Sequence, residues 1–349
     1  MTIRKSLKVV IVFIVVYIMT SIFSLKGMSY YELSYCHESG TSQYYNVKIN
    51  GIYYNIDTDS KLCPAEVFYP FKKVDELKIP NKIKFKGKKY KVKEVTLMTD
   101  EEYCENGNAI LPSKLTLPYK TIYLPKYATS FNRVDVKLPN LRKLYVPKNT
   151  RELIGINDMP KLKVIIDKKN PYIKMKNGAV YSKNGKELLT MVNSKKTYKI
   201  SKGTTFIDFR SNKTVEKVIL PSSVINLNSG AFDWCFKLKS VKLNEELKII
   251  EGYAFEKCKS LKSITIPKNV EKIQFWAFKN CRKLSKVKIE SEEKVPIIED
   301  NAFKNTKDGI KFYVKNQTVA DQLNEQLKGN GVRNAKILIG KKVVYKNVK

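Results

Sequence analysis

One feature constrains the fold of this chain more than any other: a short motif returns at a fixed interval. The segments AFDWCFKLKSVKL (231–243), AFEKCKSLKSITI (254–266) and AFKNCRKLSKVKI (277–289) begin 23 residues apart, and AFKNT follows 25 residues later, at residue 302. A period of roughly 20 to 50 residues indicates a solenoid, because one such unit cannot bury its apolar side alone and must stack on its neighbours. We therefore expect an elongated stack of similar coils.

Each unit also contains a short strand, and this strand recurs over a longer part of the chain than the motif does. Its last apolar position is occupied in turn by Leu124, Val146, Ile166, Ile200, Leu220, Leu243, Ile266, Ile289 and Val314. The position two residues earlier is always apolar, whereas the position three residues earlier is always polar. This alternation is typical of a strand with one buried face, and it predicts a parallel sheet of nine short strands.

Three cysteines share one place in the repeat, three residues after a phenylalanine and three before a leucine. The repeated pairs are Phe232 with Cys235, Phe255 with Cys258, and Phe278 with Cys281. A zinc site would need ligands paired at short spacing, such as C-x₂-C, and the chain has no such pair. A free thiol behaves as a small buried hydrophobe, so we expect these six residues to be structural. Adjacent coils would place the thiols only about 5 Å apart, which leaves a disulfide sterically open.

The first 29 residues have the pattern of an export segment. Arg4, Lys5 and Lys8 precede an uncharged run over residues 9–25. This run is intermediate in length between the core of a signal peptide and a membrane-spanning helix. Cleavage after Ser29 and retention as a signal anchor are both open, and both place the rest of the chain outside the cytoplasm.

Three further cysteines, Cys36, Cys63 and Cys104, lie in the N-terminal part of the chain. An exported protein can form disulfides. One pair could therefore bridge and leave one thiol free, and the sequence does not choose the pair.

The remaining segments predict caps and one insertion. Residues 30–97 alternate apolar and polar residues around turns at Gly51 and Gly87, which predicts a β-rich cap. The solenoid covers 98–315, interrupted over 167–199, where Asn184-Gly185 predicts an inserted β-hairpin. Residues 316–349 predict a short helix, ending at Gly329 or Gly331, and a hairpin that closes the stack.

The unit LKSITIPKNVEKIQFWAFKNC resembles the BspA-type leucine-rich repeat, over about residues 120–315 and most strongly over 215–306. The segment NPYIKMKNGAVYSKNGKELL (170–189) is similar to the hairpin insert found in such proteins. In the N-terminal coils, FNRV, TREL and FIDFRSN replace the Ala-Phe-x-x-Cys corner. The resemblance implies a β-rich solenoid that acts as an extracellular or surface-displayed interaction protein, often in adhesion. It implies no shared catalytic residues and no cofactor.

The sequence offers little support for an enzyme. His37 is the only histidine and lies outside the repeats, so a Ser-His or Cys-His pair has no base there. The acidic clusters ESEEK (290–294) and Glu245-Glu246 fall in turns, and the chain has no glycine-rich phosphate loop and no calcium loop. A wall-glycan hydrolase would need two acids facing one cleft, which remains a third idea to test.

The net charge is +33, with 66 Lys and Arg residues against 33 Asp and Glu residues. Such a charge attracts polyanions in a salt-dependent way. A biased base composition explains the abundance of lysine equally well, because Lys, Asn, Ile and Tyr are frequent throughout the chain. Nucleic acid fits the charge, but the export segment argues against it as the main partner.

The outward face of the predicted sheet is the surface we expect to bind. Its candidate residues are Tyr123, Tyr145, Ile165, Lys199, Lys217, Ile219, Lys242, Thr265, Lys286, Lys288 and Tyr313. Aromatic contact and lysine steering suit an extracellular protein or an acidic glycan. An ordinary hydrated sheet face explains the same residues. The rival function is a structural envelope protein, retained on an anionic cell wall without a specific ligand. For either function we expect membrane contact only through the N-terminal segment, if it stays uncleaved.

Overall fold

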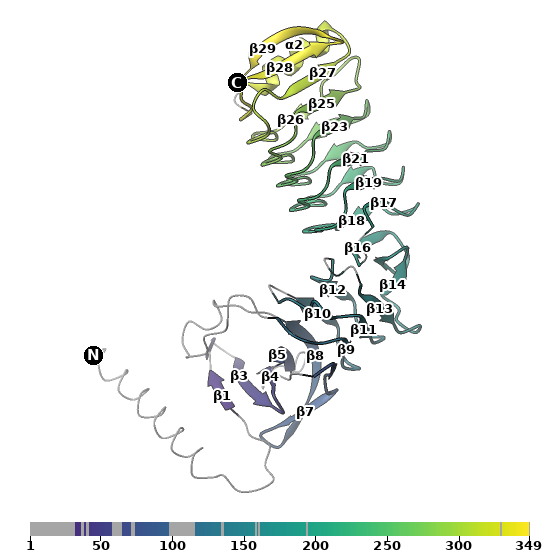
Figure 1. Ribbon diagram of the computed structural model, residues 1–349, viewed down its shortest axis with the longest axis vertical. Coiled ribbons are helices and arrows are strands. Elements are labelled where there is room, and N and C mark those ends of the chain that lie inside the picture. Colours follow the sequence, from purple (N-terminus) through teal and green to yellow (C-terminus); the bar gives the residue numbers. More distant parts are fainter. Residues whose placement is uncertain are drawn as a thin grey trace, which may run out of the picture.

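The computed structural model describes most of the repeat region and part of what precedes it. Described are residues 32–35, 38–39, 42–57, 65–70, 74–97, 116–133, 136–157, 159, 161–192, 195–328 and 330–348. The predicted export segment, His37 and the cysteines Cys36, Cys63 and Cys104 lie outside the described residues. Figure 1 shows coils stacked along the long axis of the molecule, with the C-terminal end at the top.

The first wall of the stack, here called the main ladder, consists of the predicted short strands. Its strands are β6 (Glu76–Lys78), β9 (Thr121–Tyr123), β11 (Lys143–Val146), β13 (Lys163–Ile166), β17 (Thr197–Lys199), β19 (Lys217–Ile219), β21 (Ser240–Lys242), β23 (Ser263–Ile266), β25 (Lys286–Ile289), β27 (Lys311–Val314) and β28 (Ala335–Ile339). They form three sheets in which these neighbours pair in parallel. The nine predicted strands are confirmed, and β6 and β28 add one strand at each end.

Burial in the main ladder follows the predicted alternation. Of the nine last apolar positions of the strands, eight are buried, and Ile166, which directly precedes the insertion, is partly buried. The polar positions three residues earlier face solvent, with the exception of the buried Thr121. The alternation therefore fixes which side chains the sheet presents outward.

A second wall runs along the stack and was not predicted. Its strands are β8 (Lys88–Leu97), β10 (Ser130–Arg133), β12 (Glu152–Ile154), β16 (Glu187–Met191), β18 (Phe206–Ile207), β20 (Asn226–Leu227), β22 (Ile249–Ile250), β24 (Lys272–Ile273) and β26 (Ile297–Ile298). Neighbouring strands of this wall pair in parallel within three runs: β8 to β12, β16 with β18, and β20 to β26. No pairing between the described strands joins one run to the next. Most strands of this wall are only two or three residues long, which is too short for periodicity to reveal them.

The third side of each C-terminal coil is the Ala-Phe corner. Phe232, Phe255, Phe278 and Phe303 are buried and stack with ring centroids 5.3, 5.1 and 5.0 Å apart, close to the spacing of adjacent strands. The three cysteines of the corner are buried and free, as predicted, so no disulfide joins them. These columns hold the coils together through apolar contact along the stack.

The insertion between β13 and β17 contains more structure than the predicted hairpin. β14 (Ile173–Lys176), β15 (Ala179–Ser182) and β16 form an antiparallel meander, with turns at Asn177-Gly178 and Asn184-Gly185. The second turn was predicted, and the first was missed although it carries the same Asn-Gly signal. In Figure 1 this meander lies between the N-terminal and C-terminal coils.

Both ends of the stack carry additional elements. At the N-terminal end are β1 (Glu32–Tyr35), β2 (Glu38–Ser39), β3 (Ser42–Ile49), β4 (Ile52–Asp57), β5 (Ala65–Pro70) and β7 (Lys82–Phe85). The hairpins β3–β4 and β7–β8 turn at Gly51 and Gly87, as predicted. β6 and β8, although within residues 30–97, already belong to the two walls of the solenoid.

The C-terminal end is closed by a helix and a hairpin. Helix α2 (Gln317–Leu327) begins after Asn316, whose side chain accepts a hydrogen bond from the Val319 amide. Its C-cap is Lys328, directly before Gly329, in agreement with the first of the two predicted ends. β28 pairs in parallel with β27 and turns back through Gly340 into β29 (Lys342–Val348). Among the described residues, no helix is long and apolar enough to span a bilayer.

Candidate binding surface

The predicted surface residues lie together on the outward face of the main ladder. Their Cα partners place them in three runs: Tyr123, Tyr145 and Ile165; Lys199, Ile219 and Lys242; Thr265, Lys288 and Tyr313. Lys217 and Lys286 belong to the neighbouring outward column. The insertion separates the first run from the second. The register of the repeat thus places each of these residues where the sequence analysis expected it.

Charge is distributed very unevenly between the two walls. From β9 to β28, the strands of the main ladder carry no acidic residue. Their lysines are Lys143, Lys163, Lys199, Lys217, Lys242, Lys286, Lys288, Lys311 and Lys336. In the second wall, the strands from β10 to β26 carry Arg133 and Lys272 against Glu152 and Glu187. Over these strands the positive charge is concentrated on the main ladder. The first strand of each wall differs, because β6 carries Glu76 beside Lys78 and β8 carries four lysines against Glu94.

Ion pairing increases this contrast. Lys217, Lys242 and Lys286 are exposed, and none pairs with an acid among the described residues. On the second wall, by contrast, Lys248 Nζ lies 2.8 Å from Glu271 and Lys272 Nζ lies 2.5 Å from Glu299. Beside the main ladder, Glu216 pairs with Lys239 at 2.7 Å but with none of these three lysines. Positive potential on the main ladder is therefore expected to be strongest at Lys217, Lys242 and Lys286.

Within the part of the chain that the structure describes, two lysines of the main ladder do pair with acids: Lys78 of β6 lies 3.5 Å from Glu76, and Lys288 of β25 pairs with Glu290. Of these two, Lys288 is a predicted contact. Its ammonium lies 2.7 Å from Glu290, which also receives Lys315 at 3.5 Å. The hydrogen bond from Lys288 holds the pKa of the Glu290 carboxyl below its usual range. The negative charge of Glu290 therefore partly cancels the positive charge of Lys288. Lys288 is for this reason a weaker candidate contact than Lys217, Lys242 or Lys286.

The tyrosines present their edges to solvent. Tyr123 and Tyr145 stack with centroids 4.5 Å apart and planes within 6°, and the Lys78 ammonium lies 5.4 Å from the centroid of Tyr123. The ring faces are therefore largely occupied, and what remains accessible is the hydroxyl edge. This arrangement favours hydrogen bonding to a partner over stacking on a sugar ring. Lys78 was missed because ELKIP (76–80), which has the spacing of the repeat, was assigned to the cap.

A second group of exposed side chains was missed at the Ala-Phe corner. Trp234 and Phe275 are 42% and 43% exposed, and neither belongs to the main ladder. The sequence carries a signal for them. The residue before each Ala-Phe pair and the residue two after it vary from coil to coil, and two of these positions hold tryptophan.

One surface groove of about 640 Å³ lies between β12 and the insertion. It contains Glu152 and Glu187 beside Arg151, Tyr172 and Lys183. Both carboxylates are exposed to solvent, whereas the acid of a glycosidase is held in an apolar pocket. Among the described residues, no three His, Cys, Asp or Glu side chains are grouped so that they could hold a metal ion.

Comparison with known proteins identifies the repeat. Residues 199–323 match the model of the BspA type leucine rich repeat region in six copies. These residues are therefore BspA-type leucine-rich repeats, and the resemblance seen in the sequence is confirmed. The chain matches no curated protein.

Several solved structures are similar to this chain at low sequence identity. The pneumococcal vaccine antigen PcpA is 18% identical, with 89% of this chain and 100% of that chain covered and a TM-score of 0.48. A leucine rich cell surface protein from Faecalibacterium prausnitzii is 15% identical, with coverages of 82% and 97% and a TM-score of 0.44. A leucine-rich repeat protein from Bacteroides ovatus is 18% identical, with coverages of 84% and 99% and a TM-score of 0.38.

Proposed function

We propose that this chain, whose residues 199–323 are BspA-type leucine-rich repeats, is a secreted or cell-surface binding protein. It binds an acidic protein or glycan through the outward face of the main ladder. The observation that carries the proposal is the distribution of charge beyond the first strand of each wall: the main ladder has lysines in most strands from β9 to β28 and no acid, whereas the strands of the second wall from β10 to β26 carry equal numbers of basic and acidic residues. A location outside the cell is supported by the basic and apolar N-terminal segment.

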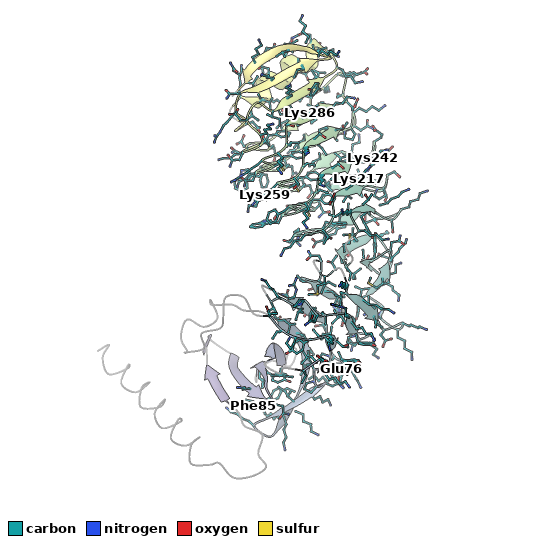
Figure 2. All side chains as sticks on the ribbon, in the orientation of Figure 1. Glu76, Phe85, Lys217, Lys242, Lys259 and Lys286 are labelled. Atoms are coloured by element: carbon teal, nitrogen blue, oxygen red, sulfur yellow. The ribbon has the colours of Figure 1, made fainter. Side chains whose placement is uncertain are left out.

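The geometry of the face suits an extended acidic partner. Solenoids commonly use the broad surface of their stacked strands for binding. Lys217, Lys242 and Lys286 project from different coils, as their labels in Figure 2 show, so their charges are spread along the stack rather than gathered at one point. Unpaired lysines speed the encounter with a polyanion and set its register, and this contribution weakens as salt rises.

The test compares two variants of equal net charge, with heparin as the acidic probe. The first replaces Lys217, Lys242, Lys286 and Lys288 by Ser. The second replaces Lys168, Lys202, Lys268 and Lys294, which are exposed lysines of the turns, by Ser. We expect the first variant to bind at least about tenfold more weakly at low salt and with a flatter salt dependence, because each lost contact removes a salt-sensitive interaction. The second should bind like the parent chain.

Two results would contradict the site. If the first variant binds heparin as the parent chain does, the main ladder is not the contact surface. If both variants lose affinity equally, only net charge matters, and the face has no special role.

The second candidate function is retention on an anionic cell wall without a specific ligand. It is favoured by the net charge of +33, which exceeds what the main ladder alone contributes. Washing cells with concentrated salt separates the two functions. If the chain is only retained by charge, salt should release it and both charge-matched variants should be retained equally less well. If it binds a specific partner, only the main-ladder variant should detach from the cells.

A further inference from the structure

A cluster of aromatic rings protrudes from the Ala-Phe corner, and we name it the aromatic ridge. It consists of Trp234, Phe236, Tyr253, Phe275 and Trp276. Tyr253 lies 5.4 Å from Phe275 and 5.1 Å from Trp276, and Trp234 lies 5.6 Å from Phe236, measured between ring centroids. The rings thus form two contact groups, in which Trp234 and Phe275 are exposed and the other three are partly buried. Isolated exposed hydrophobics are ordinary on protein surfaces, whereas aromatic residues gathered at one corner point to an interaction site.

Three of these aromatic residues occupy a left-handed backbone conformation that bulky side chains adopt only at a cost. Trp234, Tyr253 and Trp276 have φ of 59°, 59° and 56°. At the equivalent positions the neighbouring coils hold Gly230, Lys257, Asn280, Asn301 and Asn305, all with positive φ as well. Gly and Asn adopt this region readily, whereas a bulky aromatic residue does so at a cost of roughly 1–2 kcal/mol. Because the turn needs no ring there, the strained aromatic residues indicate a role on the surface.

Lysines hold positive charge against the rings. The Lys257 ammonium lies 3.9 Å from the centroid of Trp234, and the Lys279 ammonium lies 3.8 Å from that of Trp276. Both lysines also approach Oε1 of the buried Glu256, at 3.6 and 3.9 Å. The lysines that cover the two tryptophans therefore share one buried carboxylate, which relates the two parts of the ridge.

The basic character extends beyond these two lysines. Lys259 lies 4.6 Å from the centroid of Phe236, and Arg282, Lys283 and Lys304 are exposed on the same corner. Asp300, which lies opposite Phe275 in the next coil by the register of β24 and β26, is an exposed acid at one end of the ridge. In Figure 2 the Lys259 label lies at the edge of the coils away from Lys217 and Lys242, so the ridge is separate from the main ladder.

We propose that the aromatic ridge docks this chain on an anionic lipid bilayer. A lysine lies over one face of each indole, and a second ring contacts each indole as well, Phe236 against Trp234 and Tyr253 against Trp276. Both contacts reduce the open ring face on which a sugar could stack. The rings project from turns at one edge of the coils, where they can enter a lipid surface. Aromatic rings sit well at the boundary between headgroups and acyl chains, and the lysines beside them meet lipid phosphates.

The test uses the full chain and its own fluorescence. The chain has only two tryptophans, Trp234 and Trp276, and both lie on the ridge. Tryptophan fluorescence therefore reports on the ridge alone. The N-terminal segment has no tryptophan, so its insertion into the same vesicles adds no signal of its own. With phosphatidylglycerol vesicles we expect a blue shift and quenching by brominated acyl chains, with neither change on pure phosphatidylcholine vesicles. The variants Trp234→Phe and Trp276→Phe assign the signal to each ring.

A charge-matched pair of variants tests whether the ridge drives the contact. Replacing Lys259, Arg282 and Lys283 by Ser should reduce quenching at a given lipid concentration about tenfold or more, because each surface cation contributes to attraction by anionic lipid. Replacing Lys217, Lys242 and Lys286 by Ser should leave quenching unchanged and instead weaken heparin binding, so this proposal and the proposed function fail separately. Absence of a blue shift on phosphatidylglycerol would overturn the inference. So would a shift produced by polyglutamate and not by vesicles, which would assign the ridge to an acidic polypeptide.

Discussion

At the scale of single residues, the repeated cysteines act as packing groups. The thiols of Cys235, Cys258 and Cys281 donate to the carbonyl oxygens of Phe209, Phe232 and Phe255 in the preceding coil, at 3.2, 3.2 and 3.0 Å. Each thiol thus fills a small apolar space and adds a weak second donor to a carbonyl that already accepts a backbone amide of its turn. A thiol suits this position because it packs as a small hydrophobe and still has a partner for its S–H group.

These cysteines should be inert in the folded protein. Burial raises the pKa of the Cys235 and Cys258 thiols, which suppresses the nucleophilic thiolate, and all three side chains are closed to solvent. We expect the peptides containing Cys235, Cys258 and Cys281 to escape iodoacetamide under native conditions and to react fully in denaturant, as measured by mass spectrometry. Modification of all three without denaturant would contradict the packed corner.

Asp233 makes the native state sensitive to pH. Burial, followed by repulsion from Glu256, raises the pKa of Asp233 to about 6, although Lys257 and Arg210 oppose the shift. Among the described residues its Oδ1 has no hydrogen-bond partner. The pKa in the folded chain exceeds the ordinary value of 3.8. Between these two values the native state therefore binds a proton that the unfolded chain does not bind, and stability falls as pH rises through this window.

Asp233→Asn should remove this pH dependence. Solvent reaches part of the Asp233 side chain and screens its charge, which reduces the effect of the raised pKa on stability. We therefore expect the variant to be more stable than the parent chain by about 1 kcal/mol at pH 7.5. Near pH 4 the carboxyl is protonated in the native state, so the advantage should disappear. Urea unfolding at both pH values measures the difference. An advantage of equal size at both would show that the ionised carboxylate is not the cause.

At the scale of elements, the insertion joins two hydrophobic cores. Along β15 the side chains alternate: Ala179 and Tyr181 belong to the core of the C-terminal coils, whereas Val180 belongs to the core of the N-terminal coils. A strand buried on both faces lacks the alternation of apolar and polar residues on which strand prediction depends. For this reason the sequence predicted the Asn184-Gly185 turn but not that the meander separates two cores. The meander therefore acts as a two-sided spacer that continues the stack.

Tyr181 fastens this spacer to the main ladder. Its hydroxyl lies 3.1 Å from the Tyr198 hydroxyl and accepts a hydrogen bond from the Ser201 amide at 3.3 Å, both in buried surroundings. Tyr181→Phe leaves these buried partners unsatisfied and should lower the free energy of unfolding by about 1–3 kcal/mol in urea titrations.

A matched Tyr→Phe change at the surface provides the control. Tyr172 is exposed, and its hydroxyl accepts a hydrogen bond from Arg151 at 3.1 Å. Tyr172→Phe should change the free energy of unfolding by less than about 0.5 kcal/mol, because both freed groups are exposed to water. A comparable loss at Tyr172 and Tyr181 would show that the hydroxyl at Tyr181 does not fasten the spacer.

At the scale of the whole molecule, the fixed period made most of the fold predictable. A constant repeat sets the register, so the outward columns of the main ladder, from Tyr123 to Tyr313, could be assigned from residue spacing alone. The second wall and the aromatic ridge could not. Pairs such as Lys248 with Glu271 depend on contacts between coils, and the strain at Trp276 depends on a backbone angle that spacing does not encode.

Lysine footprinting tests the central claim, that the charge of the main ladder is the binding surface. Acetylation of the heparin-bound and free chain, read by mass spectrometry, should show Lys217, Lys242 and Lys286 losing reactivity on binding. Lys248 and Lys272, which pair with acids on the second wall, should react equally in both states. Protection of Lys248 and Lys272, with Lys217, Lys242 and Lys286 unchanged, would contradict the account.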